Sequence, residues 1–74
     1  MDWSKFDLAM SDDRYLGGAA VFEEEPRMPV QTVLDNLEDG MAPEAVADSW
    51  QIDLRLVNAV KEFAESRRFA RALR

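Results

Sequence analysis

The stretch that decides the fold is PVQTVLDNLEDGMAPEAVADSWQIDLRLVNAVKEFAESRR, residues 29–68. We expect it to form three helices with two short breaks between them. The first helix begins at Pro29, because a missing N–H costs nothing in a first turn, and Gly40 ends it as a left-handed cap. The second helix begins at Pro43. The third begins at Asp53, whose carboxylate can accept hydrogen bonds from the free N–H groups of the next turn.

Apolar residues recur at helical spacing in each of these helices. In the first helix they are Val30, Val33, Leu34 and Leu37. In the second they are Val46 and Trp50. In the third they are Leu56, Val57, Val60, Phe63 and Ala64. Two helices joined by a tight turn, with the second long and capped, are typical of a helix-turn-helix. The predicted fold is therefore mainly α, with a three-helix helix-turn-helix-like unit preceded by a short β-arm or hairpin.

The chain is expected to form a single domain, residues 1–74, because so short a sequence has no room for a second core. Around the three-helix core, residues 29–66, we expect two further segments. Residues 1–28 are predicted to be an N-terminal arm with a short β-hairpin. Residues 67–74 are predicted to be a basic amphipathic helical tail that continues the third helix.

Within the N-terminal arm, Val21-Phe22 and Arg27-Met28 predict two rungs of a small hairpin. Its tip would carry the three glutamates of residues 23–25 as a solvated acidic loop. Gly17-Gly18 favours positive φ or a close backbone approach, because no phosphate-loop pattern surrounds it. Residues 1–10 fit either a helical turn or a strand. They would either cover a hydrophobic edge of the domain or insert into a partner's groove.

Composition argues against catalysis. The chain has no cysteine and no histidine, and its serines and single threonine lack activating neighbours, so nucleophilic catalysis has no candidate residue. The same absence leaves a zinc site without its usual ligands, and adjacent glutamates rarely converge on one ion. We therefore expect a protein that is not an enzyme, with no catalytic residues, no metal and no cofactor.

The small size of the chain predicts a partner. A domain of 74 residues has a core worth only ~3–5 kcal/mol, so packing against another chain would add needed stability. We expect a homo-oligomer or a complex with another protein. No apolar run approaches the roughly 20 residues that span a bilayer, and the start of the chain lacks the pattern of a secretory signal. We therefore expect a cytoplasmic protein with no membrane partner.

The net charge of −6 is distributed unevenly. Residues 1–49 carry twelve acids and three bases, whereas residues 50–74 carry three acids and six bases. An acidic body repels nucleic acid, yet a local basic face can still bind it. In a helix-turn-helix the third helix enters the major groove. The candidate DNA-binding residues are Arg27, Arg55, Asn58 and Lys61. Arginine and asparagine can read bases, but they also occur on any solvated helix face.

The tail ESRRFARALR continues the third helix without a stop signal. Arginines near a helix C-terminus favour the helix dipole, which is a purely structural explanation of their presence. The helix dipole does not explain Phe69 and Leu73, two large apolar residues that a three-helix core does not need. We therefore predict a partner-binding surface made of Arg67, Arg68, Phe69, Arg71 and Leu73.

In their order and spacing, these features resemble those of the small bacterial proteins of domain-of-unknown-function family 433. The similarity covers about residues 8–66 and is carried by Gly17-Gly18, Val21-Phe22, Arg27-Met28-Pro29-Val30, Gly40, Pro43-Glu44, and Asp53 at the position of a capping threonine. The chain departs from the family pattern at Glu25-Pro26, Ala42 and Ser49-Trp50. These departures concern the hairpin tip and the ends of the second helix, and the tail has no fixed counterpart in the family.

The resemblance implies a helix-turn-helix-related fold and an antitoxin-like component of a type II toxin–antitoxin pair. Such a protein would neutralise a PIN-like ribonuclease toxin by direct binding, and operator DNA would be a further partner. The basic tail suits the acidic, metal-binding site of a nuclease, an assignment that rests on its own residues. The alternative is a dimeric helix-turn-helix DNA-binding transcriptional regulator without a toxin partner. A plain dimerisation or adaptor domain that shares the fold is a third interpretation, because fold does not fix function.

Overall fold

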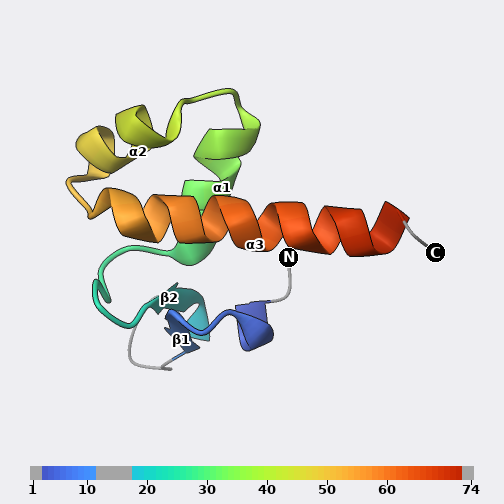
Figure 1. Cartoon of the computed structure of the whole chain (residues 1–74). Coiled ribbons are helices and arrows are strands. Elements are labelled where there is room, and N and C mark those ends of the chain that lie inside the picture. Colours follow the sequence, from blue (N-terminus) through green and yellow to red (C-terminus); the bar gives the residue numbers. More distant parts are fainter. Residues whose placement is uncertain (1–2, 12–17, 73–74) are drawn as a thin grey trace.

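The computed structural model describes residues 3–11 and 18–72, with side chains described as far as residue 67. Along the described chain the elements are a short 3-10 helix (η1), strands β1 and β2, and helices α1, α2 and α3 (Figure 1). Their bounds are η1 Trp3–Lys5, β1 Ala9–Ser11, β2 Ala20–Phe22, α1 Val30–Glu38, α2 Pro43–Trp50 and α3 Leu54–Ala72. The predicted fold class, a three-helix unit preceded by a small antiparallel hairpin, is confirmed.

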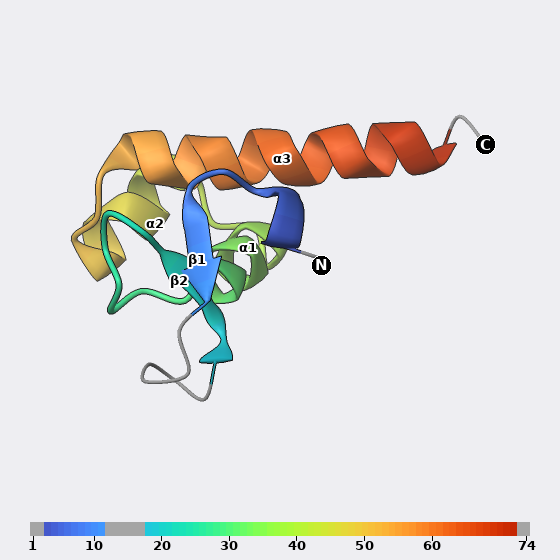
Figure 2. The ribbon, with the colours of Figure 1, turned by 90° about the horizontal axis from the view of Figure 1, so that it is seen from below.

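Helix α3 is the element against which the rest of the chain packs. In Figure 1, α1 and α2 lie toward one side of α3 and the two strands lie toward the other. In the view from below, all of these elements lie on one side of α3, and its other side carries none of the drawn elements (Figure 2). No helix among the described residues combines the length and apolar composition that crossing a membrane requires.

The end of α1 has the predicted left-handed glycine. Gly40 has φ +99°, and its N–H donates to the carbonyl of Leu37 at 3.1 Å. The N–H of Met41 donates to the carbonyl of Asn36 at 3.2 Å, which completes a Schellman motif. At the other end the helix begins at Val30, so Pro29 is the residue before its first turn rather than the first within it. Pro29 still suits that position, because no intrahelical hydrogen bond uses its nitrogen.

A second Schellman motif forms the turn between α2 and α3. Pro43 begins α2 as predicted, and the helix ends where Gln51 adopts a left-handed conformation with φ +54°. The N–H of Ile52 then donates to the carbonyl of Ala47 at 3.0 Å. The predicted cap of the third helix is also confirmed, because Oδ1 of Asp53 accepts a hydrogen bond from the N–H of Arg55 at 2.9 Å.

The core lies between α3 and the elements beneath it. Its buried apolar residues on the helices are Val30, Val33, Leu34, Val46, Ala47, Leu56, Val57, Val60 and Ala64. No polar or charged side chain is buried in the described part of the chain. One expectation is wrong: Trp50 does not share the apolar face of α2 with Val46, since 47% of it is exposed. Ala47, directly after Val46, takes the second buried position of this short helix.

The strands pair differently from the prediction. β1 pairs with β2 in antiparallel register, with Met10 opposite Val21. The expected pairing of residues 21–22 with 27–28 is present only as an isolated bridge between Val21 and Pro29 and as a hydrogen bond from the N–H of Phe22 to the carbonyl of Met28 at 3.2 Å. β2 therefore pairs with β1 on one side and, through the isolated bridge, with Pro29 on the other. The sequence indicated only the second and weaker of these pairings.

The N-terminal arm covers an edge of the core with aromatic side chains. Phe6 is buried, and its ring centroid lies 5.1 Å from that of Phe63. Trp3 stacks on Phe63 at 5.6 Å, and its Nε1–H donates to Oε1 of Gln31 at 2.9 Å. Residues 1–10 were left open between a helical turn and a strand, and they contain both, in η1 and β1. Since Phe6 is buried in its own core, the edge-covering interpretation of the arm is the correct one.

Candidate functional site

The C-terminal part of α3 extends beyond the core. Ala64 is the last buried residue of the helix that the structure describes, yet the helix continues to Ala72, about 12 Å further along its axis. Both views show this end of α3 running past the other elements (Figures 1 and 2). The backbone of α3 therefore extends about two turns past the last buried residue that the structure describes.

Four of the five predicted partner-binding residues, Arg67, Arg68, Phe69 and Arg71, belong to this extension. The guanidinium carbon of Arg67 lies 4.9 Å from the ring centroid of Phe63, which anchors the start of the tail to the aromatic cluster of the arm. Arg68, Phe69 and Arg71 lie in the helical part of the backbone, while their side chains are outside the described residues. Leu73 lies outside the described residues altogether.

A second candidate surface lies at the other end of α3, beside the α2–α3 turn. Trp50 is 47% exposed and Leu54 is 37% exposed, and these are the exposed large hydrophobic residues of the described chain. A shallow surface hollow, which we call the Trp50 hollow, separates this turn from the loop after β2. It is lined by Glu25, Arg27, Met28, Trp50, Gln51 and Ile52.

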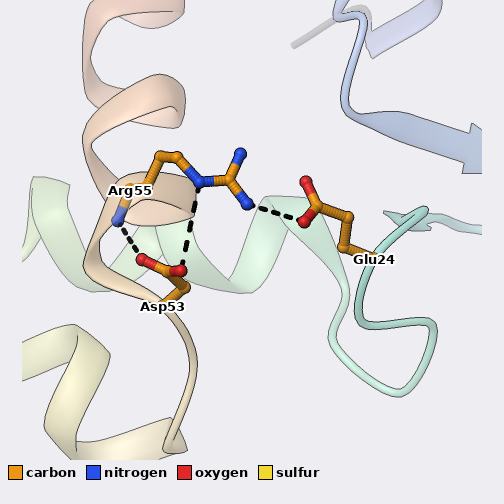
Figure 3. Close-up of polar contacts among 3 residues, drawn as sticks. All are labelled: Glu24, Asp53 and Arg55. Atoms are coloured by element: carbon orange, nitrogen blue, oxygen red, sulfur yellow. Dashed lines mark hydrogen bonds and ion pairs between the residues drawn. The ribbon is translucent and has the colours of Figure 1, made fainter.

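An ion-pair network joins the same two segments. Nη2 of Arg55 donates to Oε1 of Glu24 at 2.6 Å, and Nε of Arg55 lies 3.9 Å from Oδ2 of Asp53 (Figure 3). The hydrogen bond that Arg55 donates to Glu24, then the charge of Glu24, and to a lesser extent the charge of Asp53 raise the pKa of Arg55. The guanidinium therefore already has two carboxylate neighbours within its own chain.

The four predicted DNA-binding residues do not form one basic surface. Arg27 lines the Trp50 hollow, and Arg55 is held by Glu24. Asn58 and Lys61 are exposed on α3, and Lys61 lies beside a separate hollow near the end of α1. The charged side chains next to Arg27 and Arg55 are carboxylates, those of Glu24, Glu25 and Asp53. This arrangement does not present a continuous row of cations to a phosphate backbone.

The sequence reasoning missed the exposure of Trp50 and Leu54 and the contact of Glu24 with Arg55. The spacing of four between Val46 and Trp50 placed Trp50 on the buried face, so no local signal indicated its exposure. Glu24 and Arg55 are 31 residues apart in the sequence, and no local sequence pattern predicts their contact.

Within the described residues there is no group of three or more histidine, cysteine, aspartate or glutamate side chains that could hold a metal ion. Of the acidic loop, Glu23 and Glu24 are exposed and Glu25 is partly buried. The two candidate surfaces are the extension of α3 and the Trp50 hollow, and they lie at opposite ends of the same helix.

Comparison with known proteins supplies the family. The family model described as "Protein of unknown function (DUF433)" matches residues 10–64, which is well over half of the chain. No curated protein and no solved structure matches the chain. The matched range includes most of β1 and all of β2, α1 and α2, and it ends at Ala64, the last buried residue of α3 that the structure describes. The chain is therefore a member of the DUF433 family.

Proposed function

We propose that this protein is a non-catalytic binding module of the antitoxin type, which acts in the cytoplasm and neutralises a PIN-like ribonuclease toxin by direct contact. The observation that supports this proposal best is the extension of α3 beyond the core. The description of the family names no activity, so the proposal rests on this extension and on what the resemblance to antitoxin-like proteins implies.

The extension has the chemistry needed to occupy an acidic site. Residues 67–74 read RRFARALR, with four arginines and no acid. The catalytic centre of a metal-dependent nuclease is lined with carboxylates, and arginine binds carboxylates through two parallel hydrogen bonds. Phe69 and Leu73 would supply the apolar contacts that give such an interface its affinity. The helix would thus enter the ribonuclease site while the core of the antitoxin stays outside it.

A regulator that binds operator DNA is the second candidate function. The observation in its favour is that Asn58 and Lys61 are exposed on α3, the helix that would enter a major groove. The network around Arg55 weighs against it, because a guanidinium paired with Glu24 must first release that carboxylate to read a base. We therefore rank the protein-binding function first.

The test is capture of the ribonuclease followed by an inhibition assay. The full chain, immobilised through its N-terminus, is incubated with lysate of its source cell, and bound proteins are identified by mass. Cleavage of an RNA substrate by the recovered ribonuclease is then measured against increasing amounts of free chain. The proposal expects cleavage to cease near one equivalent. Recovery of the chain alone, or of a ribonuclease that it fails to inhibit, would contradict the proposal and favour the DNA-binding regulator.

A further inference from the structure

The N-terminal arm packs against α3 at Phe63, one residue before the last buried residue of that helix that the structure describes. Trp3 stacks on the Phe63 ring, with the centroids 5.6 Å apart and the ring planes 25° from parallel. The ring of Phe6 lies 5.1 Å from the same ring, tilted by 52°. Both views show the dark blue η1 as the last element beside α3 before this helix runs past the rest of the chain (Figures 1 and 2). Two aromatic side chains of the arm therefore hold Phe63 near the point where α3 leaves the core.

Trp3 is also attached to the first helix. Its Nε1–H donates to Oε1 of Gln31 at 2.9 Å, across 28 residues of sequence. Gln31 in turn donates from Nε2 to Oδ1 of Asp35 at 3.0 Å, one turn further along α1. These two hydrogen bonds fix the side-chain amide of Gln31, and the amide fixes the position of the indole. The ring that stacks on Phe63 is therefore held from α1 as well as from the arm.

Phe63 also contacts the first residue of the tail. The guanidinium carbon of Arg67 lies 4.9 Å from the Phe63 ring centroid, a cation–π contact. The two residues are four apart, so they lie next to each other only while the turn between them is helical. Arg67 is partly buried, whereas Glu65 and Ser66 before it are exposed. One basic side chain of the predicted partner-binding set is thus bound within its own chain.

This contact bears on the stability of the extension. The backbone of α3 is helical to Ala72, past the last buried residue that the structure describes. The end turns of a helix open more readily than its middle, and a side-chain pair four residues apart stabilises the turn that contains it. Such a pair forms at a lower entropic cost when one member is already immobile. Because the arm immobilises Phe63, it favours the helical state of the turn that ends at Arg67.

We propose that Trp3 and Phe6 are positioning residues for the tail. They hold Phe63, Phe63 holds Arg67, and the tail therefore starts as an ordered helix with a fixed direction. Arg67 serves as an anchor within the chain, and the partner-binding surface begins at Arg68. This inference deepens the proposed function and rests on it where it concerns toxin binding, because a tail that is already helical loses less entropy on binding. The order of the tail is itself a property of the free chain.

The experiment measures hydrogen exchange of the backbone amides of residues 68–72 by NMR in the free full chain, without any ribonuclease. These amides belong to α3, so their exchange reports the opening of its last turns. Trp3→Leu removes the stacked ring and the hydrogen bond to Gln31. Trp3→Phe keeps an aromatic ring at this position. Trp50→Leu is the matched control, since it makes the same change at an exposed tryptophan on α2.

We expect Trp3→Leu to speed exchange of residues 68–72 by a factor of about three to ten, through loss of the aromatic stacking. Arg67→Met should speed it by a factor of about two to five, through loss of the cation–π contact. Trp3→Phe should keep most of the protection, and Trp50→Leu should keep all of it. The two effects should add incompletely in the double variant, because both act through Phe63. Unchanged exchange in Trp3→Leu, or fully additive effects, would overturn the proposal.

A purely structural role of the arm predicts a different result. Val46→Ala removes buried methyl groups of α2 and lowers the stability of the whole fold. It should speed exchange of core amides such as those of Val57 and Val60. Residues 68–72 should be unaffected, because local opening at a helix end does not require the core to unfold. If Val46→Ala speeds exchange in the tail as much as Trp3→Leu does, the arm acts only through overall stability and the proposal is wrong.

Failure of this proposal is distinguishable from failure of the antitoxin function. Exchange is measured in the free chain, and inhibition is measured with the ribonuclease. If both proposals hold, Trp3→Leu should weaken inhibition by no more than the factor found for exchange, because only the open fraction of the tail is lost to binding. Faster tail exchange in Trp3→Leu supports the positioning role even where no ribonuclease is inhibited. Full inhibition with unchanged exchange supports the antitoxin function and overturns the positioning role.

Discussion

Arg55 donates a hydrogen bond to Oε1 of Glu24 at 2.6 Å, and this contact ties the first turn of α3 to the loop after β2 (Figure 3). Glu24 raises the pKa of Arg55 above its usual value. A cation whose folded-state pKa is raised contributes stability that is fully present below its unfolded pKa and is lost only as the pH rises through the folded value. Since arginine already titrates far above neutrality, its charge in this pair is constant between about pH 6 and 10.

The first prediction concerns this pair. Glu24→Gln removes the charge while keeping the shape, and we expect it to lower the thermal midpoint by about 1–4 °C at low salt, because the pair is exposed to solvent. The difference should shrink in 1 M NaCl, where the Debye length falls to about 3 Å and the attraction between exposed charges is weakened. Glu23→Gln is the matched control and should leave the midpoint unchanged. Equal shifts in the two variants would mean that the Arg55 contact adds nothing specific to stability.

The second prediction separates protein binding from DNA binding. In the variant Arg55→Ala/Asn58→Ala, both side chains of α3 that could read bases are removed. We expect inhibition of the ribonuclease to be unchanged, because the proposed function assigns that contact to the tail. Titration of the variant against the captured ribonuclease gives the inhibition constant, and fluorescence anisotropy with operator duplex gives the affinity for DNA. A tenfold loss of inhibition would mean that the start of α3 is part of the toxin interface.

Much of the helical unit could be predicted from local chemistry. Gly40, Pro43 and Asp53 set the helix ends because each residue type has a conformational or capping preference that acts within one turn. The apolar spacing of α3 likewise identified its buried face. The pairing of β1 with β2 was not found, since three-residue strands carry almost no periodic signal and their partners lie about ten residues apart.

The third prediction concerns the left-handed turn between α2 and α3. Gln51 adopts φ +54°, a conformation that costs less for glycine than for other residues. We expect Gln51→Gly to raise the free energy of unfolding by about 0.5–1 kcal/mol, measured by urea denaturation. Gly40→Ala supplies the opposite case, because φ at Gly40 is +99° while nothing lies within 4 Å of the added methyl group. That variant should lose about 1 kcal/mol or more, through backbone strain alone.

If Gln51→Gly destabilises the protein instead, the side chain of Gln51 makes a contribution that outweighs its backbone strain. That result would also bear on the Trp50 hollow, since Gln51 forms part of its wall.

The fourth prediction tests the role of the N-terminal arm. Phe6 is 7% exposed and contacts the rings of Trp3, Phe22 and Phe63. Phe6→Ala should lower the free energy of unfolding by about 3 kcal/mol or more, through loss of buried surface and the cavity that remains. Lys5→Ala, at an exposed neighbouring position, should change it by less than about 0.5 kcal/mol. Urea denaturation of both variants gives the comparison, and a small effect at Phe6 would show that the arm is not part of the core.

The candidate surfaces were harder to predict than the core. The basic tail could be identified because its arginines and two apolar residues exceed what the three-helix core requires. The exposure of Trp50 could not be predicted, because a spacing of four placed it on the same face as Val46, and yet Trp50, the last residue of α2, is exposed. The partner of Arg55 depends on how a loop folds back on α3, which is a property of the tertiary structure.

The measurement that tests the central claim most directly is the inhibition constant of the full chain compared with that of a chain lacking residues 68–74. This truncation keeps Arg67 and its contact with Phe63, and it removes no side chain of the described core. We predict that inhibition of the ribonuclease falls by a factor of about 100 or more while the thermal midpoint changes by only a few degrees. Full inhibition by the truncated chain, or its loss through unfolding, would contradict the assignment of the α3 extension as the toxin-binding element.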